Sequence, residues 1–157
     1  MNIQFDLDTA GSDRLLNAAR KFAKSPRKAI TGALFALDRK IRDTFQQQKD
    51  PWGKPWKPLK PATLAGRKRK GRNRTSILVD TAEMFRSLER EVTGANEGVI
   101  SIGTEDRPVT PHQFGVKENN LPARPMMPIR PSGVSIPKTW RDAVDDELVK
   151  AMRESIT

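Results

Sequence analysis

Residues 25–48, SPRKAITGALFALDRKIRDTFQQQ, contain the clearest structural pattern in this chain of 157 residues. Apolar side chains follow one another there at steps of four, three, four and four: Ile30, Leu34, Leu37, Ile41 and Phe45. This spacing places all five on one face of an α-helix. Pro26 suits the first helical turn, where its missing amide donor is not needed, and the pair Asp50–Pro51 ends the helix near Gln48. The pattern therefore predicts a long amphipathic helix.

Shorter patterns around this helix predict a mixed α+β domain. Residues 3–7 alternate between apolar and polar side chains, as in a short strand, and residues 12–23 follow with a helical apolar stripe. Residues 81–88 fit a short helix, and residues 92–102 fit a β-hairpin because apolar, mostly β-branched flanks enclose small and polar turn residues. From Trp140, apolar residues recur every fourth position in a C-terminal helix. We therefore expect one α+β domain over residues 1–157, with helices on one face of an antiparallel sheet.

The surplus of positive charge lies in one segment. The chain has 29 Lys and Arg residues against 19 Asp and Glu residues, a formal net charge of +10. Residues 51–79 hold nine of the basic residues and no acidic one, so the remainder is nearly neutral. The densest part includes Arg67, Lys68, Arg69, Lys70, Arg72 and Arg74. Because this run repels itself and lacks apolar anchors, residues 66–76 are predicted to form a flexible basic loop that contacts an acidic surface or DNA. A purely solubilising loop and, in a eukaryotic host, a nuclear-import signal are the alternatives.

Two proline-rich stretches are predicted to be extended. Residues 51–61 interleave four prolines with Trp52 and Trp56, whose indole rings we expect to anchor this segment to the core. Within residues 119–137, four prolines recur every third residue, which is the period of a polyproline II helix. The apolar residues between them favour an arm on the protein's own surface or on a neighbouring subunit. A recruitment motif for proline-reading domains is the alternative.

No catalytic or metal-binding constellation stands out in the sequence. The chain has no cysteine, no tyrosine and one histidine, His112, which has no nucleophile or second histidine at a ligand spacing. The run Asp145–Asp146–Glu147 cannot converge on one ion, because consecutive helical positions diverge by about 100°. Neither phosphate-binding glycine pattern occurs, and residues 29–37, the longest nearly apolar stretch, are too short to cross a bilayer. We therefore expect no enzyme, no cofactor, no metal and no membrane contact.

Five short pieces in a fixed order resemble the phage virion morphogenesis proteins, the tail-completion family related to the G protein of phage Mu and the S protein of P2-like phages. These pieces are PWGKPWKPL followed by Thr63, then ILVDTAEMFRSL, ISIGT, HQFG and LPARPMMP. They cover roughly residues 45–128. The chain departs from the family pattern at Ala82, where the family usually has glycine, and at Val109–Thr110, where it has an aromatic–alanine pair. Both departures concern local turn geometry.

The resemblance implies a structural role at the head–tail junction, or neck, of a phage. Such proteins are similar to tail terminators, which are small α+β subunits that often form a ring of six, cap the finished tail and give the head connector a surface to bind. The implied partners are other copies of this chain, tail tube or tail terminator proteins, head–tail connector or adaptor proteins, and DNA in the channel. The implied location is the virion, after assembly in the cytoplasm of the bacterial host.

In such a ring, we expect the proline-rich arm to contact the neighbouring subunit, because a stiff arm loses little conformational freedom on binding. The contact residues of this arm would be Pro122, Arg124, Pro125, Met126, Met127 and Pro128. The structural anchors within the subunit would be Trp52, Trp56, His112 and Phe114.

The alternative function is sequence-nonspecific DNA binding through residues 67–74. That function predicts an affinity for duplex that falls steeply as salt rises. Against it, no predicted helix presents the basic residues in a row that suits a groove.

Overall fold

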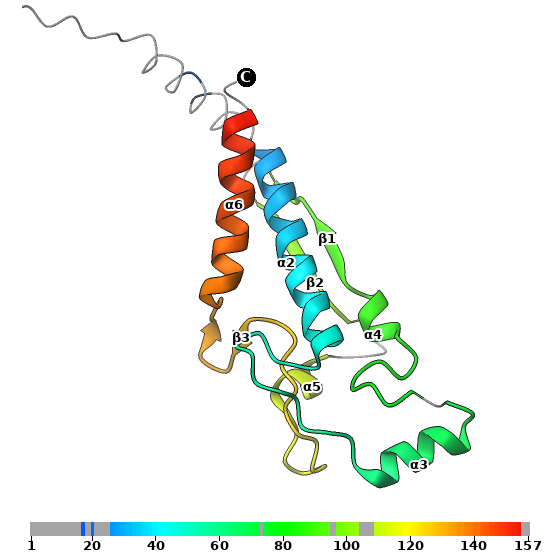
Figure 1. The fold of residues 1–157 in the computed structure, drawn as a ribbon. Coiled ribbons are helices and arrows are strands. Elements are labelled where there is room, and N and C mark those ends of the chain that lie inside the picture. The colour runs from blue at the N-terminus through cyan, green and yellow to red at the C-terminus, as the bar shows by residue number, and fades with distance from the viewer. Residues whose placement is uncertain are drawn as a thin grey trace, which may run out of the picture.

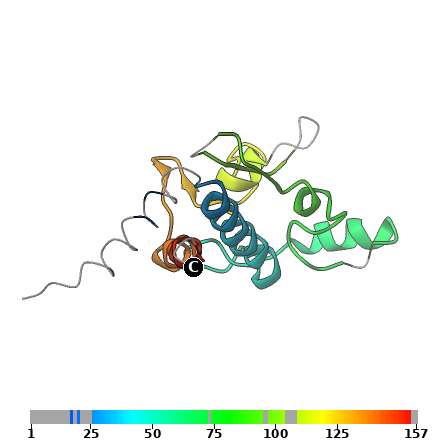
Figure 2. The same cartoon turned by 90° about the horizontal axis from the view of Figure 1, so that it is seen from above.

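The computed structural model describes residues 26–72, 74–94, 97–103 and 109–154, together with Asn17 and Arg20. The strand expected over residues 3–7 and nearly all of the helix expected over residues 12–23 lie outside the described residues. Two long helices, α2 (Arg27–Gln47) and α6 (Lys138–Glu154), run antiparallel and side by side (Figures 1 and 2). They confirm the two helices predicted from the four-residue and three-residue steps of their apolar side chains.

The other face of α2 packs against a β-hairpin (Figure 1). Strand β1 (Glu89–Glu91) pairs antiparallel with β2 (Val99–Ser101). A Cβ atom on Gly98 would lie only 2.8 Å from Leu34 Cδ1, so glycine allows the hairpin to lie this close to the helix. Asp38 of α2 is buried and forms ion pairs with Arg42, at 2.9 Å, and with Arg90 of β1, at 3.5 Å. The pair with Arg90 attaches the hairpin to α2, whereas the pair with Arg42 lies within the helix.

The predicted hairpin is confirmed, but its first strand lies earlier in the chain than residues 92–94. The amides of Thr93 and Gly94 both donate to the carbonyl of Glu97, at 3.1 and 3.2 Å. This closure makes residues 92–94 part of the connection, and the ladder begins at Glu91 opposite Val99. The short helix predicted over residues 81–88 is present as α4 (Glu83–Arg86).

The α+β class is confirmed, although the antiparallel strands form two separate hairpins. The second sheet pairs β3 (Ile129–Arg130) with β4 (Gly133–Val134), and it lies within the segment predicted to be a proline-rich arm. The short helix α5 (Thr110–Phe114), which the sequence patterns did not predict, contains the HQFG piece except for its glycine. Among the described residues, no helix is long and apolar enough to cross a membrane.

The main core lies at the C-terminal end of α2 and joins residues from most of the chain. Its buried members are Ile41, Phe45, Trp56, Ile77, Leu88, Val109, Met126 and Trp140. The rings of Phe45 and Trp56 meet edge to face at 5.7 Å, and the indole N–H of Trp56 donates to the carbonyl of Pro125 at 2.9 Å. Trp56 is therefore an anchor, as predicted. Trp52 is half-buried, and the Arg130 guanidinium lies 4.2 Å from the centre of its ring.

Gln113 holds the proline-rich segment in place from the side of α5. Its side chain is buried, and its amide oxygen accepts hydrogen bonds from the backbone N–H groups of Met126 and Met127, at 3.0 and 3.1 Å. Its amide nitrogen donates to the carbonyls of Met127 and Ile129, at 2.9 and 2.8 Å. One side chain thus makes four hydrogen bonds to backbone groups of this segment.

The proline-rich segment packs largely on its own chain. Arg124, Met126 and Pro128 are buried within the same protomer. An intersubunit role for this segment stays a prediction, and burial limits it to the half-buried members Pro122, Pro125 and Met127. Phe114, predicted as a structural anchor, is 42% exposed, and its anchoring role stays a prediction. His112 is half-buried.

The predicted basic loop over residues 66–76 is wrong in its first part, because α3 (Pro61–Arg69) extends through it. Pro61 occupies the first helical turn, and Arg and Lys are good helix formers. The last turn holds Arg67, Lys68 and Arg69, where the partial negative charge of the helix C-terminus favours cations. This local effect outweighs the mutual repulsion on which the loop prediction rested. Figures 1 and 2 show α3 standing away from the α2–α6 pair.

Ala82, which replaces the usual family glycine, has a left-handed backbone with φ of 62°. This conformation costs a residue with a Cβ atom about 1–2 kcal/mol. Replacing Ala82 with glycine should remove that cost, whereas Ala143→Gly, within α6, should lose about 1 kcal/mol of stability. We expect urea unfolding, followed by tryptophan fluorescence, to give a free energy of unfolding about 2–3 kcal/mol higher for the first variant than for the second. Equal values would contradict the strain at Ala82.

Gln113→Glu tests the contacts of the proline-rich segment. A carboxylate cannot donate to the carbonyls of Met127 and Ile129, so the variant should lose about 2–3 kcal/mol of unfolding free energy. Gln46→Glu, at an exposed position of α2, is the matched control and should change it by less than about 0.5 kcal/mol. Similar urea midpoints for the two variants would show that the Gln113 contacts do not support the fold.

Candidate functional site

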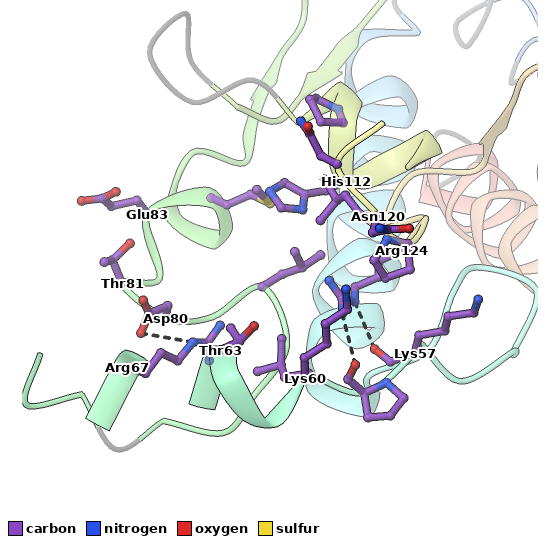
Figure 3. Close-up of a pocket in the computed structure, with 18 residues that line it drawn as sticks. Lys57, Lys60, Thr63, Arg67, Asp80, Thr81, Glu83, His112, Asn120 and Arg124 are labelled. Carbon is purple, nitrogen blue, oxygen red and sulfur yellow. Dashed lines mark hydrogen bonds and ion pairs between the residues drawn. The ribbon is translucent and has the colours of Figure 1, made fainter. Parts of the chain in front are cut away.

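A cavity of about 1190 Å³ opens between α3 and the rest of the molecule (Figure 3). Four parts of the chain line it: residues 57–67, residues 78–84, the start of α5, and residues 119–124. The apolar part of the wall comes from Pro58, Leu59, Leu78, Met84, Pro111, Leu121 and Pro122. Segments that are far apart in sequence therefore build one concave surface, with α3 as a side wall.

Arg124 is the buried cation of this cavity. The residue is only 5% exposed. Its Nε atom donates to the carbonyl of Lys57 at 3.1 Å, and its Nη2 atom donates to the carbonyl of Pro58 at 3.3 Å. No carboxylate pairs with it among the described residues. Burial lowers the pKa of the Arg124 guanidinium, and the positive charge of Arg67 lowers it further. Two carbonyl dipoles offset part of the cost of burying this charge.

Three more cations line the cavity: Lys57, Lys60 and Arg67. Lys57 and Lys60 are exposed and have no carboxylate partner in the described part of the chain. The acidic lining residues are Asp80 and Glu83. Asp80 is already paired, with Arg67 at 3.6 Å and with Arg72 at 2.9 Å. Positive charge therefore predominates in the cavity wall.

Arg67 also shapes the basic segment that follows α3. Its Nη1 atom donates to the carbonyls of Arg74 and Ser76, at 3.0 and 2.8 Å. These bonds fold the segment after Gly71, where φ is 70°, back along the helix. Arg67 thus joins the cavity wall to the chain beyond α3.

His112 faces the cavity without a catalytic partner in the described residues (Figure 3). Burial lowers its pKa, and the positive charge of Arg124 lowers it further. Its Nδ1 atom is buried and has no hydrogen-bond partner there. No group of three His, Asp or Glu side chains that could hold a metal ion occurs among the described residues either. What the cavity does assemble is a set of cations, amides and hydroxyls beside an apolar wall, which suits binding of an anionic group.

The structure separates the six basic residues that the sequence grouped together. Arg67 lies in the cavity wall and Arg72 pairs with Asp80. The other four are exposed: Lys68, Arg69, Lys70 and Arg74. Sequence reasoning missed the cavity role of Lys57 and Lys60, although both belong to the acid-free segment 51–79. It also missed the four hydrogen bonds that Gln113 makes to the proline-rich segment, because no local sequence pattern indicates them.

The lowered pKa of His112 predicts a loss of stability in mild acid. The unfolded chain binds a proton near the ordinary histidine pKa of about 6.5, whereas the folded chain resists it, so the free energy of unfolding falls as the pH drops through that value. His112→Gln should remove this contribution. We expect wild type to lose more stability than the variant between pH 7.5 and 5.5, measured by urea unfolding at both pH values; equal losses would contradict the assignment.

Comparison with known proteins gives one match. No curated protein and no solved structure matches the chain. The sequence profile of the phage virion morphogenesis family matches residues 9–148. This range includes α2, both hairpins, every residue of the cavity wall and most of α6. A match over this much of its length shows that the chain belongs to the phage virion morphogenesis family.

Proposed function

We propose that this protein is a structural component of the head–tail junction, which completes or caps the tail and joins it to the head as a homo-oligomeric ring. Membership of the phage virion morphogenesis family makes it a virion morphogenesis protein and carries the proposal. Its place in the virion would be the neck. Its partners there would be other copies of itself, tail tube or terminator proteins and connector proteins.

The packing of α3 supports assembly with neighbours. No residue of this helix is buried within the protomer. Isolated helices of nine residues are marginal in water, because helix formation needs about 12–15 residues or tertiary packing. A helix that stands away from its own core, with exposed cations in its last turn, suits a contact with another subunit or an adjoining ring.

Exposed apolar side chains on other elements support the same proposal. Phe35 of α2 is 50% exposed, Val99 of β2 49% and Val134 of β4 73%. They lie on three different elements. A ring subunit uses two different surfaces, because each head-to-tail contact joins unlike faces.

Nonspecific DNA binding is the second candidate, and the exposure of Lys68, Arg69, Lys70 and Arg74 favours it. These cations could neutralise phosphates of DNA in the channel of a ring. As an independent function, it would give a duplex affinity that falls with salt in proportion to the phosphates neutralised.

Purified protein should form rings in negative-stain electron microscopy and sediment as a discrete oligomer in analytical ultracentrifugation. Mixed with tails from phage that lack this gene, the rings should cap one tail end. Monomers at all concentrations that also leave the tails uncapped would contradict the proposal.

The triple variant Lys68→Gln, Arg69→Gln, Lys70→Gln should reduce docking to tails about tenfold, because each exposed ion contact contributes about 0.5 kcal/mol. A matched triple variant, Lys49→Gln, Lys54→Gln, Lys117→Gln, removes three exposed lysines elsewhere and should dock as wild type does. Complementation of the deletion phage, scored as infectious yield, measures both. Equal yields would show that α3 does not take part in docking.

A further inference from the structure

We propose that the cavity beside α3 binds an extended acidic peptide segment of a neighbouring virion protein, with Arg124, Lys57 and Lys60 receiving its carboxylates. The identity of the neighbour rests on the proposed function. The inference adds the chemistry by which this protein would bind that neighbour. The experiment below separates the two.

The buried charge of Arg124 is the first argument. Arg124 is only 5% exposed as a residue, and among the described residues its guanidinium donates to two carbonyls and pairs with no carboxylate, so it retains a large part of its desolvation cost. Its pKa is lowered by this burial and by Arg67, which lines the same cavity. A carboxylate that enters the cavity would form a charge-assisted hydrogen bond with Arg124 and so lower the desolvation cost of the guanidinium. The attraction between the two charges is strengthened because Arg124 lies in a low-dielectric wall.

The other charged side chains of the cavity differ in whether they already have a partner. Asp80 is already committed to Arg67 and Arg72, while Lys57 and Lys60 have no carboxylate partner within the described residues. The wall therefore holds more cations than its two acidic residues, Asp80 and Glu83, can offset, and Lys57, Lys60 and Arg124 are cations without a carboxylate partner among the described residues. They are spaced along residues 57–60 and at residue 124, so they can meet several carboxylates of one chain.

The shape and lining of the cavity favour a peptide over nucleic acid. A cavity of about 1190 Å³ has room for several side chains, and its apolar wall gives them surface to bury. Thr63, Asn119 and Asn120 offer hydroxyls and amides to the peptide backbone. Phosphates of duplex DNA lie on the outside of a wide cylinder and meet exposed cations, such as Lys68 and Arg69, more readily than a recessed guanidinium.

The test is isothermal titration of the purified full-length protein with an acetylated and amidated eight-residue peptide in which glutamate alternates with leucine. The same peptide with glutamine in place of glutamate is the ligand control. The acidic peptide should bind at least about tenfold more tightly, and its affinity should fall between 50 and 300 mM salt, where screening shortens the reach of charges. Equal affinity for both peptides would overturn the proposal.

Variants of the protein test whether the peptide binds in the cavity or on the exposed face of α3. The pair Lys57→Gln, Lys60→Gln should weaken binding about tenfold, and Lys68→Gln, Arg69→Gln, which removes two exposed cations of α3, should not. Arg124→Gln should abolish binding where circular dichroism shows that it folds; if it does not fold, the first pair still decides the matter. Loss of binding in the α3 pair alone would overturn the assignment to the cavity.

Two further outcomes separate the possible occupants and the two proposals. A 20-base-pair duplex that displaces the peptide, and whose own binding depends on Lys57 and Lys60, would make nucleic acid the occupant and overturn the inference. Rings that form and cap tails without peptide binding would overturn the inference alone. Peptide binding by a protein that forms no rings and caps no tails would overturn the proposed function alone.

Discussion

The fold depends on how a segment rich in proline is attached to a core. Proline has no backbone N–H and cannot take part fully in a β-ladder, so such a segment must find its hydrogen bonds elsewhere. Gln113 supplies four of them from one side, and the indole of Trp56 donates a further one to the carbonyl of Pro125. Arg124, a member of the segment, donates outward from its guanidinium to the carbonyl of Lys57. With this segment in place, Met126 is completely buried and closes the core against α2. The same attachment brings Arg124 into the wall of the cavity.

The molecule has two regions of different character. The α2–α6 pair and the first hairpin form a packed body, whereas α3 and the segments around the cavity present charge and concave surface (Figures 1 and 3). Positive charge is not uniform within the second region. Cations that are exposed on α3 are suited to contacts with broad surfaces, and those in the cavity to insertion of a narrow, flexible chain. If the protein lies in the neck, as proposed, this division would give it two different ways of holding its neighbours.

Sequence predicted those parts of the fold that depend on local spacing. The helices α2 and α6 follow from apolar side chains at helical intervals, and the antiparallel hairpin follows from its flanks and turn. The register of β1 could not be predicted, because it depends on the closure of the loop by the carbonyl of Glu97. The helix α3 was missed because composition emphasises repulsion among the cations, while their place in the last turn decides the outcome.

The candidate site was only partly accessible from sequence, for a physical reason. The acid-free segment 51–79 pointed to the right region, but the cavity needs four segments to meet, and their meeting is set by tertiary packing. Arg124 illustrates the difference: its position in a proline-rich run suggested a surface arm, whereas its hydrogen bonds lead inward to Lys57 and Pro58. Likewise, nothing near Gln113 in the sequence shows that its partners follow 13 to 16 residues later.

The spacing of the prolines has a consequence for spectroscopy. Between Pro122 and Pro128, the amide protons with a hydrogen bond to α5 are those of Arg124, Met126 and Met127, and all three point to the adjacent residues His112 and Gln113. Three resonances in a nitrogen-correlated NMR spectrum therefore report whether the whole segment is seated. The rate at which these three amide protons exchange with deuterated solvent measures how often the proline-rich segment detaches from α5.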